Sequence, residues 1–305
     1  MSMIEPPEQW GRLVAEIKEM RGTVLVIGAP DSGKTTLTRF LVSELCNRGA
    51  AVAYIDGDMG QSILGPPTTQ GMALLAGPFG DLEKAPLDAA YFVGSTSPRG
   101  HGLETLVGLK RLLERSQADR NRLAILDTTG YVTGEDAVEL KYQKIDLLGP
   151  SHIVALQRNG EIEPILRTQE GRERAVIHRL SSPSRVRSRS QEERRRHRWN
   201  RFQEYFKTVR LHRVDLRRTT LTGTHRLRIH DRPQEGLEGL LVALNDPDNF
   251  VVTLGIIENL NRTKGILSCL VPSTVDLERT LTVRLGSIRI DLSEDTDGER
   301  FLGYD

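Results

Sequence analysis

The sequence is poor in several residue types and patterns that mark particular classes of protein. It has two cysteines in 305 residues, Cys46 and Cys269, whose unrelated contexts exclude a disulfide framework and paired zinc-ligand spacings. Residues 1–10 lack the basic and apolar regions of a signal peptide, and no apolar run approaches the roughly 20 residues of a membrane-spanning helix. We therefore expect a soluble protein of a reducing, cytoplasmic compartment, with no membrane contact.

Charge of one sign is also lacking. The 42 basic and 41 acidic residues give a net charge of only +1, so no overall basic excess points to nucleic acid. Any such argument must depend on where the charge is placed along the chain. Hydrophobic residues make up 38% of the sequence, which is enough for a soluble protein of this length to bury a core.

In the first 180 residues, short apolar runs alternate with segments whose apolar residues are spaced as on one face of a helix. Runs of β-branched and apolar residues predict buried strands, and apolar residues at helical spacing predict helices. The expected strands are 23–27, 51–55, 90–93, 123–126 and 153–156, and the expected helices are 10–17, 34–48, 103–113 and 137–148. Prolines and glycines predict an irregular stretch at 65–71. The alternation predicts an α/β fold, a parallel sheet with helices on both faces.

The pattern changes after about residue 180. Pro183 and several serines predict a loop, and a charged stretch with helical character follows at 189–206. Beyond residue 207, period-2 alternation predicts strands at 240–244, 250–254, 265–270 and 281–290, with a hairpin turn at Asn245-Asp246-Pro247. We therefore expect an α/β domain over residues 1–207 and a small C-terminal β domain over residues 208–305.

A glycine-rich segment at residues 28–35 follows the first expected strand and matches the pattern G-x-x-x-x-G-K-[ST] of a phosphate-binding P-loop. Glycines let the backbone amides turn inward around phosphates, and the following helix adds its positive end. Lys34 would reach the β and γ phosphates, and the Thr35 hydroxyl would bind Mg²⁺. The expected nucleoside-triphosphate site consists of Gly28, Ala29, Pro30, Asp31, Ser32, Gly33, Lys34, Thr35 and Thr36.

Carboxylates follow two of the other expected strands. Asp58 follows the second strand, and Asp127 ends the fourth in the manner of a Walker-B aspartate. The carboxyl ends of parallel strands meet at one crevice, where a carboxylate can hold Mg²⁺ directly or through water, or accept a proton from an attacking hydroxyl. We expect functional roles for Asp58 and Asp127, and an ordinary strand-end turn role for Asp56.

Arginines crowd the segment after the last expected strand of the α/β region: Arg185, Arg187, Arg189, Arg194, Arg195, Arg196, Arg198 and Arg201. A charge run is equally typical of a solvated helix face. Phosphoryl-transfer enzymes, however, often carry a closing lid at this position, whose arginines neutralise charge on the transferred group. Such arginines can also bind a polynucleotide backbone. The nearby aromatics at helical spacing, Phe202, Tyr205 and Phe206, are more typical of a core.

In this order and spacing, the motifs resemble the P-loop polynucleotide 5′-hydroxyl kinases, the RNA-processing kinases of the tRNA-splicing, mRNA 3′-end and ribosomal-RNA type with their archaeal and bacterial relatives. The family's Asp-x-Gly-Gln site looks like Asp58-Met59-Gly60-Gln61, and its clasp segment looks like Ser95-Thr96-Ser97-Pro98. Its Thr-x-Gly-aromatic strand end looks like Asp127-Thr128-Thr129-Gly130-Tyr131, although many members have asparagine at the first position and tryptophan at the last.

The resemblance extends to the lid and the C-terminal region. An arginine-rich lid over about residues 181–206 is matched by Arg189-Ser190, Arg194-Arg195 and Arg198. The runs at 239–242, 254–256 and 285–289 look like the small β domain of the ribosomal-RNA-processing and archaeal branch. The similarity therefore covers nearly the whole chain from about residue 23.

Read through this resemblance, the protein would transfer the γ-phosphate of ATP to the 5′-hydroxyl end of RNA or DNA. Lys34 would bind the β and γ phosphates, and Thr35 would bind Mg²⁺. Asp58 would position or deprotonate the attacking hydroxyl and could contact metal-bound water, while Arg189 and Arg194 would close over the transition state. Thr96 and Ser97 would restrain Lys34. The implied substrate residues are Gln61, Thr96, Ser97, Tyr131 and Asp127.

Two other functions stay open from the sequence. One is an ATP-binding, non-catalytic scaffold of a nucleic-acid-processing complex, and the other is a small-molecule P-loop kinase. A guanine-selective switch is disfavoured because no Asn-Lys-x-Asp motif follows the last expected strand, where the chain reads Gln157-Arg158-Asn159-Gly160. The preference for RNA or DNA and the oligomeric state are not encoded in any motif that we can identify.

Overall fold

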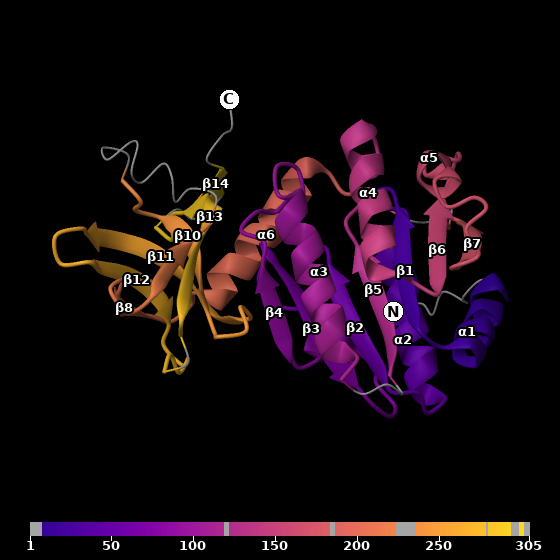
Figure 1. Cartoon of the computed structure of the whole chain (residues 1–305), viewed down its shortest axis with the longest axis horizontal. Helices are drawn as coiled ribbons and strands as arrows, with labels where there is room; N and C mark the ends of the chain where they lie inside the picture. Colours follow the sequence, from indigo (N-terminus) through magenta and orange to yellow (C-terminus); the bar gives the residue numbers. More distant parts are fainter. Residues whose placement is uncertain are drawn as a thin grey trace.

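A computed structural model of the protein describes residues 8–118, 122–183, 187–223, 236–278, 280–293 and 299–301. Two seven-stranded sheets lie next to each other, and helix α6 (Gln191–Tyr205) lies between them (Figure 1). The sheet at the right of the view is covered by helices, whereas the sheet at the left is built from the C-terminal strands. Within the described ranges, no helix combines the length and apolar character needed to cross a bilayer.

The first sheet contains a parallel core and one reversed strand. Its order is β4-β3-β2-β5-β1-β6-β7, with bounds β1 (Thr23–Gly28), β2 (Val52–Gly57), β3 (Thr69–Leu75), β4 (Ala89–Phe92), β5 (Leu123–Thr128), β6 (His152–Gln157) and β7 (Val176–Ser181). The pairings among β2, β5, β1, β6 and β7 are parallel, and β3 runs antiparallel to β2 and β4. The predicted α/β sheet is confirmed. The prediction of an irregular stretch at 65–71 is wrong from Thr69 on, because β3 begins there. Strand β7 was not predicted.

Helices cover both faces of this sheet, as predicted. Because strand side chains alternate between faces, Val24 and Val26 pack with α1 (Glu8–Met20) and α2 (Lys34–Asn47). Leu25 and Ile27 pack on the opposite face with α3 (Gly102–Ser116), α4 (Glu135–Leu148) and α5 (Glu163–Arg167). The short 3₁₀ helix η1 (Leu82–Lys84) adds Leu82 to the first of these cores.

The second sheet is antiparallel along its main path. Its order is β14-β13-β10-β11-β12-β8, with β9 beside β13, and its bounds are β8 (Val209–Asp215), β9 (Thr220–Thr222), β10 (Leu240–Asn245), β11 (Val251–Asn261), β12 (Ile266–Pro272), β13 (Thr282–Ile290) and β14 (Glu299–Phe301). The predicted hairpin joins β10 to β11, where Asp246 Oδ1 accepts from the backbone N–H groups of Asp248 and Phe250, both at 2.9 Å. Strands β8, β9 and β14 were not predicted.

Helix α6 joins the two sheets through a shared apolar layer. Trp199, Phe202 and Phe206 are buried against Phe92 of β4 and against the second-sheet residues Leu241, Ala243, Leu254, Ile256 and Ile288. The Tyr205 hydroxyl accepts a hydrogen bond from Leu254 N at 3.0 Å. The core role expected for Phe202 and Phe206 is therefore confirmed, and half-buried Tyr205 packs against the same layer. The buried rings of Trp199, Phe202 and Phe206 are not available for stacking on bases.

Helix α4 buries two lysines, Lys141 and Lys144, completely. Lys141 Nζ has hydrogen-bond acceptors, but within the described residues Lys144 Nζ has none. Burial lowers the pKa of Lys144 to about 8, although Asp58 acts in the opposite direction. An ammonium group without an acceptor opposes folding because it has lost its hydration.

Replacing Lys144 with methionine is expected to stabilise the protein. Below pH 8 the lysine is charged in both states, so the folded state carries the full cost of burying the charge, about 3 kcal/mol for this pKa difference. Between pH 8 and about 10.5 the folded lysine loses its proton first, and the penalty disappears as the pH rises. Urea unfolding of the Lys144→Met variant and the wild type should show the gain at pH 7 and a smaller one at pH 10. A gain of equal size at both pH values would contradict this explanation.

Candidate nucleotide and phosphoryl-transfer site

The P-loop connects the end of β1 to the start of α2, as the motif predicted. Gly33, the N-cap of α2, has φ +97°, which suits glycine. A Cβ on Gly28 would lie 2.6 Å from Leu156 O and from Ser32 Oγ, so only glycine fits there. Within the described part of the chain no side chain caps α2, so its first N–H groups are available to a phosphate.

Lys34, Thr35 and Asp127 converge behind this loop. Lys34 is 7% exposed, and its Nζ donates to Ala29 O at 2.8 Å. Burial lowers the pKa of Lys34, while Asp127, Asp58 and Asp31 raise it. Thr35 Oγ1 donates to Asp127 Oδ2 at 2.9 Å. Burial raises the pKa of Asp127, and Lys34 opposes that shift. The first turn of α2 and the end of β5 thus form one polar cluster, as expected from the strand order.

Asp58 lies on the neighbouring strand end. Asp56 of β2 is directly opposite Asp127 of β5 in the sheet register, and Asp58 follows two residues later. Asp58 Oδ1 accepts from the backbone N–H groups of Gly60 and Gln61, both at 3.0 Å. These two bonds fix the orientation of the carboxylate, which lies near enough to Lys34 to raise the pKa of that lysine.

Asp56 has a larger role than the turn residue that the sequence indicated. It is fully buried, and its carboxylate accepts from Asp58 N at 3.1 Å, Ile63 N at 2.5 Å and Leu64 N at 3.0 Å. Burial raises its pKa to about 7, and Asp127 adds to the shift. Asp56 therefore organises the loop that carries Asp58, although it is itself too enclosed to reach a substrate.

Helix α6 and the residues just before it are bonded to the P-loop through Asp31. Arg194 Nη2 lies 2.5 Å from Asp31 Oδ2, and the same oxygen accepts from Ser188 Oγ and Arg189 N, both at 3.2 Å. Ser190 begins the helix with a capping box that includes Glu193. The Arg194 side chain thus contacts the phosphate loop, whereas the Arg189 side chain is exposed and, among the described residues, its hydrogen bond to the loop comes from the backbone N–H. Arg185 lies outside the described residues.

The same helix also contacts the loop that carries Asp58. Arg201 Nη2 donates to Ile63 O at 3.2 Å and to Gly65 O. Gln61 Nε2 donates to Gly60 O at 2.7 Å and to Arg194 O at 3.4 Å. Gln61, expected from the resemblance to contact substrate, is therefore bonded to the backbone of α6 in this structure.

The clasp segment, residues 95–98, packs against the Asp58 loop. A Cβ on Gly60 would lie only 2.5 Å from Thr96 O, and Ser97 N donates to Ser95 Oγ at 3.2 Å. Within the described residues, neither Thr96 nor Ser97 is hydrogen-bonded to Lys34. Tyr131 is half-buried, and the Arg99 guanidinium lies 5.9 Å from its ring centre. No motif pointed to Arg99.

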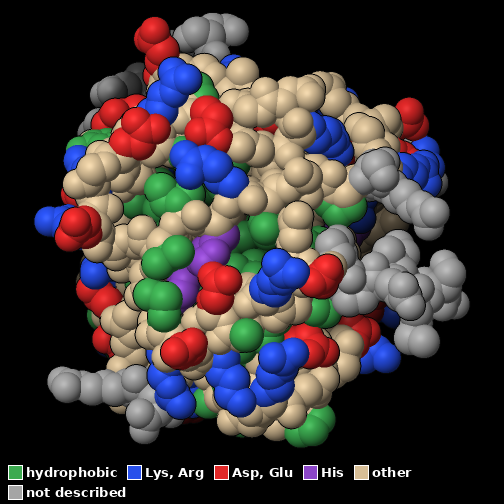
Figure 2. Space-filling model, turned by 90° about the vertical axis from the view of Figure 1, so that its right-hand side faces the viewer, with side chains coloured by type: hydrophobic (Ala, Val, Ile, Leu, Met, Phe, Trp, Pro, Cys, Tyr) green, Lys and Arg blue, Asp and Glu red, His purple; other side chains and the backbone are tan. Residues whose placement is uncertain are grey.

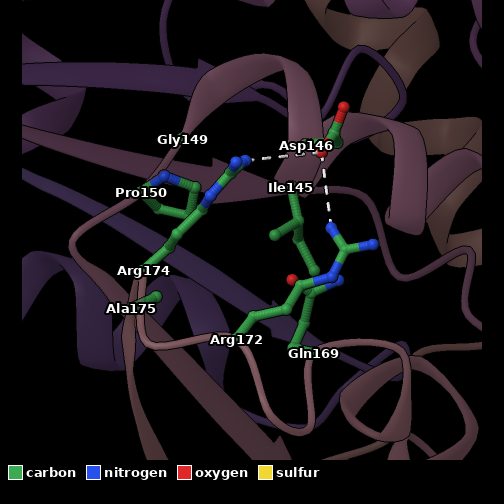
Figure 3. Close-up of a pocket in the computed structure, with 8 residues that line it drawn as sticks. All are labelled: Ile145, Asp146, Gly149, Pro150, Gln169, Arg172, Arg174 and Ala175. Atoms are coloured by element: carbon green, nitrogen blue, oxygen red, sulfur yellow. Dashed lines mark hydrogen bonds and ion pairs between the residues drawn. The ribbon is translucent and has the colours of Figure 1, made fainter.

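A small pocket elsewhere does not compete with this site. It lies at the carboxyl end of α4, near the start of β6, and Figure 3 shows its lining: Ile145, Asp146, Gly149, Pro150, Gln169, Arg172, Arg174 and Ala175. Arg172 and Arg174 both face Asp146, at 3.4 and 3.9 Å. A volume of about 20 Å³ holds one water molecule. The pocket is at the opposite end of the strands from the P-loop, and it is too small for a nucleotide.

The face of the molecule at the right of Figure 1 offers no uniform charge among its described residues. In Figure 2, basic and acidic side chains are interspersed there, with histidines set among hydrophobic side chains. Phosphate backbones bind best to surfaces where positive charge is concentrated. This face is therefore a poor candidate for binding a phosphate backbone.

A P-loop at the end of a parallel strand, a Thr–Asp pair behind it and an arginine-bearing helix over it define a P-loop protein of the phosphoryl-transfer class. The chain belongs to a particular family of that class: residues 28–208 match the family described as the mRNA cleavage and polyadenylation factor CLP1 P-loop. The predicted resemblance is thereby confirmed.

Relatives from archaea match nearly the full chain. The polyribonucleotide 5′-hydroxyl-kinase of Methanocaldococcus jannaschii is 30% identical over 88% of this chain and 87% of its own. The enzymes of the same name from Pyrococcus abyssi and Thermococcus kodakarensis are 29% and 31% identical, over 91% and 88% of this chain and 90% and 88% of their own. The solved structure of the wild-type Clp1p–Pcf11p complex aligns with a TM-score of 0.69 at 18% identity, over 91% of this chain and 77% of that one, which supports the fold.

Proposed function

We propose that this protein is an ATP-dependent polynucleotide 5′-hydroxyl kinase, which transfers the γ-phosphate of ATP to the 5′-hydroxyl end of RNA or DNA. The observation that carries the proposal is the arrangement of the Thr35–Asp127 pair, Asp58 and Arg194 around Lys34 of the P-loop. The archaeal relatives named polyribonucleotide 5′-hydroxyl-kinases support the same reaction.

The phosphate side of the site fits ATP and Mg²⁺. The backbone N–H groups at the start of α2 would bind the phosphate oxygens. The Lys34 ammonium, which now donates to Ala29 O, would donate to the β and γ phosphates instead. Thr35 and Asp127 provide the hydroxyl and carboxylate oxygens that Mg²⁺ prefers, with Asp58 nearby for metal-bound water. Mg²⁺, when bound, neutralises charge that develops on the β and γ oxygens.

On the acceptor side, Asp58 is the proposed base. Its Oδ1 is held by two backbone N–H groups, so the carboxylate keeps one orientation while it accepts the proton of the 5′-hydroxyl. The Arg194 side chain is paired with Asp31 of the P-loop, and it would leave Asp31 for the transferred phosphoryl group. Arg189 would join it from the exposed start of the lid.

The remaining substrate contacts follow the resemblance. Tyr131, half-exposed beside Arg99, would contact the terminal nucleotide, and Gln61 would do so after release from the lid backbone. Thr96 and Ser97 would restrain Lys34 once a nucleotide has moved its ammonium from Ala29 O. These roles place the polynucleotide end between the clasp and the lid.

We also propose the division into residues 1–207 and 208–305, with the lid at about 181–206. The carboxyl half of α6 packs into the apolar layer shared by both sheets, so the lid is anchored to both parts. Cys46 and Cys269 are free and buried, which suits the proposed reducing, cytoplasmic compartment.

The test is a transfer assay with γ-labelled ATP, Mg²⁺ and matched RNA and DNA oligonucleotides that carry 5′-hydroxyl ends. Label is expected at the 5′ end of at least one of them, and 5′-phosphorylated oligonucleotides are the control that should stay unlabelled. Absence of transfer to either polymer over a range of temperatures would overturn the proposal. ATP binding without transfer would instead favour the scaffold function that the sequence left open, and transfer only to small hydroxyl compounds would favour a small-molecule kinase.

A further inference from the structure

Lys141 of α4 is fully buried and lies directly behind the phosphoryl-transfer site. Its Nζ donates to Thr128 Oγ1 and to Thr129 O, both at 2.9 Å. Thr128 Oγ1 in turn donates to Val26 O of β1 at 2.8 Å. One ammonium group therefore joins α4, the turn after β5 and the strand that leads into the P-loop.

The turn that Lys141 holds comprises the last two residues of β5 and the two that follow, residues 127–130, and it touches the P-loop at two places. Asp127 Oδ1 accepts from Thr128 N at 2.8 Å, which leaves Oδ2 directed at the Thr35 hydroxyl. Three residues on, a Cβ at Gly130 would lie 2.6 Å from Pro30 N, so the turn is in close contact with the loop. A shift of this turn would move both Asp127 and the surface on which the P-loop rests.

Burying a lysine at this position costs free energy, and filling the same space with an apolar side chain would avoid that cost. Burial lowers the pKa of Lys141 well below its ordinary value, and Lys144 and Lys34 add to that shift while Asp58 and Asp127 oppose it. A methionine would fill a similar space without dehydrating a charge. The two hydrogen bonds offset part of this cost, and both are made to the turn that carries Asp127.

We propose that Lys141 is a positioning residue for phosphoryl transfer, which holds the turn at 127–130 so that Asp127 and Thr35 keep the geometry needed for the metal–nucleotide complex. The inference rests on the proposed kinase function. Lys141 acts through Thr128 and Thr129 and has no contact with the reacting atoms. It was missed in the sequence because lysines on helices are usually exposed.

The Lys141→Met variant tests this role. We expect kcat to fall about 10- to 100-fold, as is typical when a group that supports a metal ligand is removed, while KM for the oligonucleotide stays near the wild-type value. The Mg²⁺ concentration that gives half-maximal binding of a fluorescent ATP analogue should rise, whereas binding without Mg²⁺ should not change. This binding measurement needs no catalysis, so it separates failure of the inference from failure of the kinase function.

Lys144→Met is the matched control, because it removes an equally buried lysine from the same helix that makes no hydrogen bond within the described residues. It should keep the wild-type kcat and Mg²⁺ dependence. Thr128→Val, which removes the shared hydroxyl, should lower kcat as well, and its effect should be less than additive with Lys141→Met. Equal losses in both lysine variants, or a folded Lys141→Met protein with wild-type Mg²⁺ dependence, would overturn the inference. If Lys141→Met does not fold, wild-type behaviour of Thr128→Val would do so.

Discussion

Replacing Lys34 with alanine is expected to lower phosphate transfer by about 10³-fold, the effect of removing one preorganised charge donor from a water-poor site. Lys34 is nearly inaccessible to solvent and lies among Asp31, Asp58 and Asp127, so water cannot easily take its place beside the phosphates. The present acceptor, Ala29 O, belongs to the P-loop itself, which shows that the ammonium already lies within reach of the phosphate position. Single-turnover transfer from γ-labelled ATP measures the loss.

The control for this variant is Lys207→Ala, which removes an exposed lysine paired with Glu204 at 3.7 Å. It should leave transfer unchanged, because exposed ion pairs of this kind contribute little to stability and Lys207 is outside the crevice. Thermal unfolding of both variants checks that they are folded. Transfer by folded Lys34→Ala at the wild-type rate would show that the γ-phosphate is activated without this residue.

Replacing Asp58 with asparagine is expected to lower kcat by about 10²- to 10⁴-fold, the range for loss of a general base. The asparagine Oδ1 can still accept from Gly60 N and Gln61 N, so the loop should keep its shape while the proton acceptor is lost. KM for ATP should change little if Asp58 acts on the hydroxyl. Steady-state rates with varied ATP and varied oligonucleotide distinguish the two substrates.

Asp246→Asn is a close match for this change, because Asp246 Oδ1 also accepts two backbone N–H groups but lies in a turn of the second sheet. It should keep full activity. A wild-type kcat in Asp58→Asn would assign the proton to another acceptor, and Asp127, on the adjacent strand end, would be the next carboxylate to test.

The parts of the site that the sequence predicted correctly depend on short motifs and one topological rule. The P-loop is defined within eight residues, and Asp127 follows an apolar strand that had to lie beside it in a parallel sheet. Buried polar partners were harder to predict, because their roles depend on contacts between distant segments. In the sequence Asp56 looks like a turn residue. In the structure its carboxylate accepts from the backbone N–H groups of Ile63 and Leu64, and so holds the loop that follows β2.

A weak signal for Lys141 does exist in the sequence. Ala137, Lys141, Ile145 and Leu148 follow helical spacing, and the other three lie on the buried side of α4. A lysine on the buried face of a helix either extends to solvent or makes buried hydrogen bonds, and a single sequence does not distinguish the two. Likewise, β3 was hidden by Gly71, where a Cβ would lie 2.8 Å from Leu64 Cβ, so a residue that looked like a breaker is required by close packing.

The anchoring of α6 has a mechanical consequence for the proposed reaction. Its carboxyl half is held by Trp199, Phe202 and Phe206 in the layer between the sheets, whereas its amino half meets the P-loop through Asp31. We therefore expect any displacement of α6 during the reaction to be smallest at its aromatic end, so that Arg194, about one and a half turns from Trp199, would move less than Arg189 just before the helix. The second sheet would then contribute to the proposed reaction by holding the aromatic end of α6, which would limit how far these arginines can move.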